Sequence, residues 1–194
     1  MSFTRREFTR MGVAAMASAL VTPAFAQETN TGLVMEPTPP LKRRVSGFMF
    51  HDWRDHFETL TNGCILCDTG ENAVFYWSED EAITRIYPSS VPLTDELTRR
   101  GRTEVTLKRD GPEWRPTPSM LERNPDLPEY VGPGPQNPLG THALNLSWQY
   151  YRIHGTNDVR KIGRRSSNGC IGLFNEHIEE LFGFAKIGTQ VVLL

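Results

Sequence analysis

A histidine and a cysteine stand near the end of the chain, each in a setting that suits chemistry. His154 ends a β-like run, and Cys170 follows 16 positions later in a Ser-Asn-Gly-Cys turn. A thiol attacks as the thiolate, and free cysteine is mostly protonated at neutral pH, so it needs a base or a positive field. We therefore interpret Cys170 as a candidate nucleophile and His154 as its general base and acid.

Neighbouring residues can complete such a site. Gly155 allows close backbone packing, so that a carbonyl group there can orient the histidine ring. The backbone N–H groups of Gly169 and Cys170 can form an oxyanion hole beside the sulfur. Arg164 and Arg165 lie just upstream of the cysteine and can add positive field or bind a carboxylate. Taken alone, this pair is a weak pattern, because an unreactive buried cysteine is more common.

The elements that must position this pair are mostly strands. Short apolar or alternating runs bounded by turn residues predict strands at 64–69, 73–77, 83–87, 103–108, 143–148, 150–154 and 190–194. Helical spacing predicts a short amphipathic helix over 51–60 and another that Asn175 caps, and residues 93–100 are a candidate for a further short helix. The expected fold is a single mostly-β domain, sandwich- or barrel-like, with one or two short helices.

A proline-rich stretch separates these strands. Residues 111–140 contain eight prolines together with apolar and aromatic side chains such as Trp114 and Tyr130. A connection of this length in a compact domain is usually functional or disordered. Because the apolar side chains favour packing, we predict an ordered loop that flanks a groove, and a merely structural crossing loop is the alternative.

The N-terminus has the order of features found in an export signal. A twin-arginine pair, Arg5 and Arg6, precedes a weakly apolar run and an Ala-Phe-Ala cleavage pattern that ends at Ala26. We predict a signal peptide over 1–26, a linker over 27–44, a helical extension over 45–62 and a catalytic domain over 63–194. The expected location is the periplasm, reached by the twin-arginine route. An amphipathic N-terminal helix is the alternative.

Charge and hydropathy exclude two classes of partner. Removal of residues 1–26 would leave 18 basic and 22 acidic side chains, a net charge of about −4. Nucleic-acid binding calls for a clustered basic face, so we expect no nucleic-acid partner. No later segment is apolar for long enough to cross a bilayer, so the mature form should lack a membrane span. We expect the domain to act as a monomer.

Three cysteines are an odd number for an exported protein, which leaves at least one thiol unpaired. Cys64 and Cys67 could join His51 and His56 in a zinc site, or could pair as a disulfide. However, positions i and i+3 of a strand point to opposite faces. We therefore expect no metal site here, and one buried and one less buried structural thiol.

The motif around the pair resembles the catalytic signature of the L,D-transpeptidase (YkuD-type) family. The similar segments are His154-Gly155-Thr156, Ile162-Gly163 and Ser167-Asn168-Gly169-Cys170-Ile171, with further likeness in the same order at 114–120, 137–140, 151–153 and 188–191. The resemblance covers about residues 63–194. It implies an L,D-transpeptidase-like fold and acyl transfer on peptidoglycan stem peptides, without metal or cofactor.

The resemblance also implies roles for particular residues. Cys170 would attack the third-residue carbonyl of a donor tetrapeptide and expel D-alanine, and His154 would move the protons. An amine of a second stem, or of a wall-anchored protein, would then accept the acyl group. Gly155 would supply the orienting carbonyl. The supporting residues would be Gly169, Asn168 and Ser167, and the substrate contacts would be Arg164, Arg165, Thr156, Tyr151 and Trp114.

Two positions depart from the family pattern. Asn168 stands where the family usually has histidine, and Gly172 stands where it usually has arginine or a polar residue. Asparagine can donate a hydrogen bond but cannot titrate. A weakly active or non-catalytic peptidoglycan-binding protein is therefore one alternative to a transpeptidase. A hydrolase of the same fold is a second, because the residues alone do not distinguish an amine from water as acyl acceptor.

Overall fold

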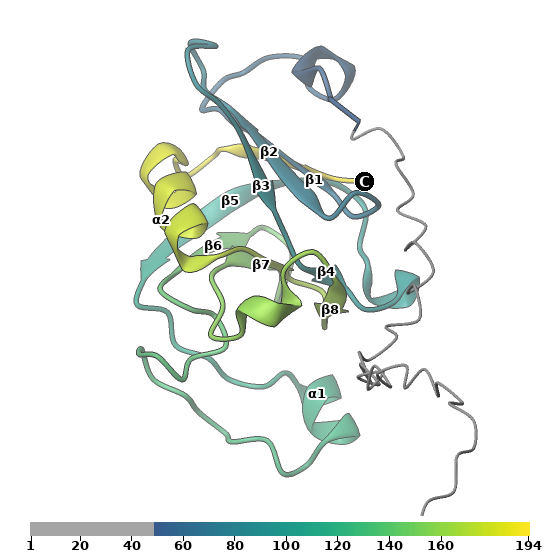
Figure 1. The fold of residues 1–194 in the computed structure, drawn as a ribbon, viewed down its shortest axis with the longest axis vertical. Helices are drawn as coiled ribbons and strands as arrows, with labels where there is room; N and C mark the ends of the chain where they lie inside the picture. Colours follow the sequence, from purple (N-terminus) through teal and green to yellow (C-terminus); the bar gives the residue numbers. More distant parts are fainter. Residues whose placement is uncertain (1–48) are drawn as a thin grey trace, which may run out of the picture. The chain divides into compact units, whose positions relative to one another are not determined.

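The computed structural model describes residues 49–194, and the predicted signal peptide and linker lie outside the described residues. Within the described part, one eight-stranded mixed sheet has the order β3-β2-β1-β10-β5-β6-β7-β9, and β4 pairs with β8 (Figure 1). The strands are β1 Cys64–Asp68, β2 Ala73–Trp77, β3 Thr84–Pro88, β4 Val91–Pro92, β5 Gly101–Asp110, β6 His142–Leu146, β7 Arg152–His154, β8 Arg165–Ser167, β9 Ile171–Gly172 and β10 Gln190–Leu193.

The described helices are short. They are α1 (Pro118–Arg123) and α2 (Asn175–Phe184), with 3-10 turns η1 (Trp53–Asp55), η2 (Asp95–Leu97) and η3 (Val159–Lys161). The large sheet is curled into a half-barrel, with α2 beside it (Figure 1). The prediction of a mostly-β fold with one or two short helices is confirmed.

Strands β1 and β2 form the centre of the core, and both of their faces are buried. Ile65 and Cys67 belong to the cluster on the α2 side, which includes Ile178 and Leu181. Cys64 belongs to the cluster on the opposite face. This alternation follows from the period of two in a strand. A continuous apolar run is therefore expected of these strands.

Cys64 and Cys67 are free thiols on opposite faces, as the alternation predicts. The expectation that one of them is less buried is wrong, since both are almost completely buried. Burial raises the pKa of Cys64 to about 12 and raises the pKa of Cys67 further. Among residues 49–194, no group of three or more His, Cys, Asp or Glu side chains could hold a metal ion.

The helix predicted over residues 51–60 is wrong, because only the turn η1 forms there. The Asp52 carboxylate accepts the Arg54 N–H at 2.9 Å and caps this single turn. His51 Nε2 lies 2.8 Å from Asp68 Oδ2 on β1, and Phe57 and Leu60 are buried against the sheet. Tertiary contacts thus bury the apolar side chains of this segment without a helix. The helix predicted over 93–100 is likewise reduced to η2.

Strands β5, β6, β7 and β9 carry the functional end of the sheet. Strands β6 and β7, which correspond to the strands predicted at 143–148 and 150–154, pair antiparallel. Strand β9 then pairs in parallel with β7, so that Ile171 lies beside Ile153 and Gly172 beside His154. Because Cys170 directly precedes β9, this register brings it close to Arg152 at the start of β7. The connection between them passes through η3 and β8.

Helix α2 begins differently from the prediction. Phe174 is the N-cap, and Asn175 is the first helical residue. The Asn175 Oδ1 atom instead accepts the backbone N–H groups of Thr156 at 3.0 Å and Thr141 at 3.3 Å. The expected cap is therefore wrong, because Asn175 bonds to two loops instead of to its own helix.

Candidate active site

One groove contains both residues of the proposed catalytic pair. It has a volume of about 400 Å³ and is lined by parts of residues 114–139, by β7 and by the segment 161–170. Cys170 and His154 line it, as do Thr156, Tyr151 and Trp114. The proline-rich stretch is thus an ordered wall of the groove, in line with the favoured prediction.

The Cys170 thiol is half-buried at the edge of this groove. Its Sγ atom donates a hydrogen bond to the Tyr150 carbonyl at 3.3 Å. Tyr150 has a φ of +68°, a left-handed conformation that is uncommon for a side-chain-bearing residue. Burial raises the pKa of Cys170 above its ordinary value of 9.0, and the Arg152 charge and backbone N–H oppose this rise. The resting sulfur is therefore a protonated thiol.

The His154 ring is held by the residue that follows it. Its Nδ1 atom lies 2.5 Å from the Gly155 carbonyl oxygen. A carbonyl oxygen only accepts, so Nδ1 carries the hydrogen and Nε2 has a free lone pair. Burial lowers the pKa of His154 to about 4, the Gly155 hydrogen bond opposes this, and the Arg152 and Lys161 charges lower it further. The ring is therefore neutral and able to accept a proton at neutral pH.

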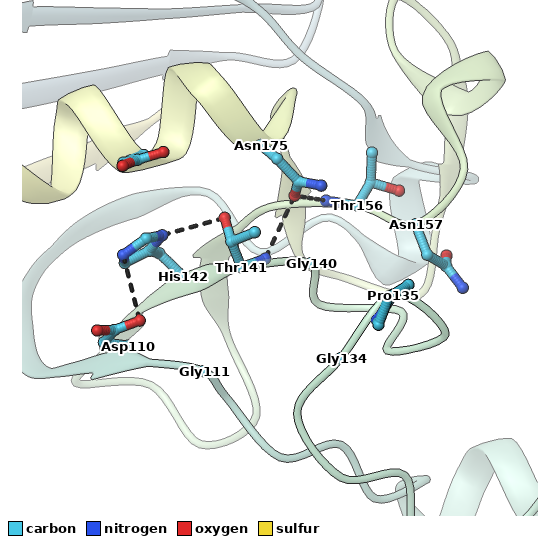
Figure 2. Close-up of a pocket in the computed structure, with 11 residues that line it drawn as sticks. Asp110, Gly111, Gly134, Pro135, Gly140, Thr141, His142, Thr156, Asn157 and Asn175 are labelled. Atoms are coloured by element: carbon cyan, nitrogen blue, oxygen red, sulfur yellow. Dashed lines mark hydrogen bonds and ion pairs between the residues drawn. The ribbon is translucent and has the colours of Figure 1, made fainter.

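A hydrogen-bonded network fixes the loop that carries this carbonyl. Figure 2 shows the Asn175 side chain between Thr141 and Thr156, whose N–H groups it accepts. A Cβ at Gly155 would lie 2.2 Å from Asn175 Oδ1, so only glycine fits there. Asn175 thus sets the position of the Gly155 peptide, although the sequence pattern suggested a helix cap.

Figure 2 also shows a second pocket, of about 600 Å³, next to this network. Its lining includes Asp110, His142 and Glu179, and Thr156 lines both this pocket and the groove. No cysteine lines the second pocket. A thiol is therefore available in the groove with Cys170 and not in this second pocket.

The turn before Cys170 is shaped by small residues. Gly169 is buried with a φ of +128°, a conformation that favours glycine. The Ser167 hydroxyl donates to the Cys170 carbonyl at 2.5 Å, and the Gly169 N–H points to the Ser167 oxygen at 3.4 Å. Ser167 thus holds the turn, and Asn168 Oδ1 accepts a bond of 2.9 Å from Arg123 of α1.

The two arginines expected to contact substrate do not line the groove. Arg164 is exposed, and Arg165 forms an ion pair of 3.3 Å with Asp95. Arg152 and Lys161 line the groove in their place. Arg152 was missed, although it stands two positions before His154 on one strand and therefore shares its face.

Asn137 holds the proline-rich wall together. It is completely buried, and its Nδ2 donates to the carbonyls of Pro112 at 2.6 Å, Gly132 at 3.0 Å and Val131 at 3.2 Å. Its Oδ1 accepts the Leu139 N–H at 2.8 Å. One amide therefore joins the beginning, middle and end of this segment.

We expect Asn137→Ala to destabilise the protein by about 2–4 kcal/mol, because several buried backbone groups would lose their partner. Thermal unfolding and limited proteolysis within residues 111–140 measure this effect. Asn157→Ala is the matched control, since Asn157 is exposed and donates one bond to the Gln136 carbonyl. Equal stability of the two variants would contradict this role of Asn137.

The profile of the family described as "YkuD: L,D-transpeptidase catalytic domain" matches residues 65–193. The chain belongs to this family. The match begins in β1 and ends with β10, so it includes the sheet, the groove and both members of the pair.

Curated relatives have the same family name. A protein named as an L,D-transpeptidase in the ATP synthase subunits region (ORF 5) of Fuscovulum blasticum is 49% identical over 191 residues, 98% of this chain and 97% of that protein. ErfK/SrfK of Escherichia coli K12, also named as an L,D-transpeptidase, is 34% identical over 142 residues, 71% of this chain and 45% of that protein. The chain thus spans less than half the length of the Escherichia coli relative.

Solved structures show the same fold at low identity. L,D-transpeptidase 3 from Mycobacterium tuberculosis has a TM-score of 0.53 at 16% identity, with 69% of this chain and 61% of that chain covered. An L,D-transpeptidase from Mycobacterium smegmatis has a TM-score of 0.51 at 18% identity, with 69% and 58% covered. L,D-transpeptidases are generally extracytoplasmic. Among residues 49–194, no helix has the length and apolar character needed to span a membrane.

The departure at Gly172 has a local explanation in this L,D-transpeptidase-family domain. Gly172 pairs with Ser90, and a Cβ at this position would lie 2.4 Å from Ser90 Oγ and 3.9 Å from His154 Cε1. A larger side chain would need Ser90 to move. Ser90 thus lies where a side chain at position 172 would start, close to His154 of the candidate pair.

Proposed function

We propose that this protein is a peptidoglycan L,D-transpeptidase that uses Cys170 as its nucleophile and His154 as its general base and acid. One observation supports this most strongly. The two side chains line the same groove, and the Gly155 carbonyl orients a neutral imidazole whose Nε2 is free to accept a proton. Family membership supplies the substrate class.

The first half-reaction forms a thioester. His154 Nε2 takes the proton of the Cys170 thiol, and the sulfur attacks the third-residue carbonyl of a donor tetrapeptide. The backbone N–H groups of Cys170 and Gly169 stabilise the oxyanion, for which Gly169 N–H must turn away from Ser167. The tetrahedral intermediate collapses as the protonated His154 gives its proton to the leaving D-alanine amine.

The second half-reaction consumes the thioester. An acceptor amine, from a second stem or a wall-anchored protein, attacks the acyl carbon while His154 takes its proton. The carbon–sulfur bond then breaks, and the thiolate recovers its proton from His154. Thr156, Tyr151 and Trp114 line the groove and contact the donor peptide, and no metal or cofactor takes part in these steps.

Incubation of the purified protein with a disaccharide tetrapeptide tests the proposal. Mass spectrometry should show the protein with an added acyl mass on the peptide that contains Cys170. The soluble products should include cross-linked dimers. Shortened stems without dimers would identify a hydrolase instead, and absence of both acyl-enzyme and product would contradict the proposed function.

We further propose that the protein acts in the periplasm after export by the twin-arginine route, with residues 1–26 removed. The paired Arg5 and Arg6 and the Ala-Phe-Ala pattern support this route. Replacement of both arginines by lysine should leave the precursor in the cytoplasm, as fractionation and immunoblotting would show. Undiminished export of the double variant would contradict the route.

A further inference from the structure

The groove that contains the candidate pair has a positively charged lining. Among the described residues that line it, Arg115, Arg152 and Lys161 are basic and none is Asp or Glu. The Arg115 guanidinium lies over the Tyr130 ring at 4.6 Å, on the proline-rich wall. Arg152 and Lys161 come from β7 and from the end of η3, close to His154 in the chain.

Of these three cations, Arg152 is the best candidate to bind an anionic ligand. Its side chain is half-buried, and within residues 49–194 its guanidinium forms no hydrogen bond or ion pair with a carboxylate. By contrast, Arg165, Arg160 and Arg85 each have a carboxylate partner at 2.8–3.3 Å. A partly buried cation without a partner favours an anion that enters the groove.

Arg152 lies close to both members of the candidate pair. It stands two residues before His154 and, in the register of β7 with β9, beside Cys170. Burial lowers the pKa of His154 and raises that of Cys170, and the Arg152 charge adds to the first shift and opposes the second. Lys161 acts on His154 in the same direction. An anionic group bound by Arg152 would therefore lie beside the scissile bond.

We propose that Arg152 forms a carboxylate-binding subsite. This subsite selects donors with a free carboxylate on the residue that is released when Cys170 takes the acyl group. This inference rests on the proposed transpeptidase function and makes Arg152 a specificity-determining residue. Lys161 increases the positive field in the groove. The exposed Arg164 does not contribute to the subsite.

Alkylation of Cys170 tests the subsite without any turnover. Iodoacetate is anionic and iodoacetamide is neutral, and both react with the thiolate. A change in thiol pKa alters both rates equally, so the ratio of the two rates reports the local attraction of a carboxylate. Cys64 and Cys67 are buried with raised pKa values, and peptide mapping of the label at Cys170 separates them.

We expect Arg152→Gln to lower the iodoacetate-to-iodoacetamide ratio by about 5- to 20-fold, the effect of one nearby unit charge at intermediate dielectric. Arg152→Lys should retain most of the ratio. Arg164→Gln is the matched control and should change it by less than about twofold. An Arg152→Gln protein with an unchanged melting temperature and an unchanged ratio would overturn the proposal.

Donor selectivity supplies the second measurement. Tetrapeptides with a free or an amidated terminal carboxylate should differ in kcat/KM with the wild-type enzyme. Arg152→Gln should raise KM for the free acid about tenfold, with a smaller change in kcat, and should reduce the preference for it. If the preference persists, the subsite is wrong while the function stands. If no variant turns over any donor, the function is wrong, and the alkylation ratio still tests the subsite.

Discussion

Replacement of Cys170 by alanine should abolish acyl transfer, with a rate loss on the order of 10⁴-fold or more. Alanine cannot form the thioester, and the remaining groove can only bind and orient the donor. The measurement is the initial rate of dimer and free D-alanine formation from a disaccharide tetrapeptide. The acyl-enzyme mass should also disappear.

The control for this prediction removes the other two thiols. A Cys64→Ala, Cys67→Ala protein should keep its acyl-enzyme and its products, although loss of two buried side-chain atoms will lower its melting temperature. Binding of the donor by Cys170→Ala, measured by calorimetry, shows that the groove is intact. Transpeptidation by the Cys170→Ala protein would contradict the central assignment.

Replacement of His154 by glutamine should lower the rate by about 10²- to 10⁴-fold, the range for loss of a general acid and base. Glutamine has similar bulk but cannot take the thiol proton. The measurements are single-turnover acylation by the donor and the rate of Cys170 alkylation by iodoacetamide. His142→Gln is the matched control, because His142 lines the second pocket and does not line the groove.

The same substitution has a pH signature in stability. The pKa of His154 is lowered to about 4 in the fold, from an ordinary value of 6.5. Between these values the unfolded chain binds the proton first, so stability falls as pH decreases through this window. From pH 7.5 to pH 5, the wild type should lose about 1–2 kcal/mol more than His154→Gln. Identical pH profiles in denaturant titrations would contradict the burial of a neutral ring.

Asn168, which departs from the family pattern, has a structural role in this fold. Its side chain is exposed and accepts a hydrogen bond from Arg123 of α1. It therefore connects the turn before Cys170 with the proline-rich wall. Because the Gly155 carbonyl already orients His154, this position has no need to titrate in the proposed mechanism.

Much of the fold followed from local patterns in the sequence. The apolar runs of β1 and β2, and the alternation in β5, predicted strands that form close to the expected bounds. Local patterns failed where tertiary contacts compete with them. The apolar spacing from residue 51 to 60 formed only η1, because His51 pairs with Asp68 and Phe57 packs on the sheet.

For the site, the sequence by itself determined the candidate pair, the neighbouring glycines and the groove wall, since motif residues lie close together in the chain. Only the tertiary structure decided which cations face the groove. Arg164 and Arg165 are nearest to Cys170 in sequence, but β8 directs this segment toward β4 and Asp95. Arg152 faces the groove because the register of β7 with β9 sets it beside Cys170. Strand register depends on long-range pairing, and short motifs do not encode it.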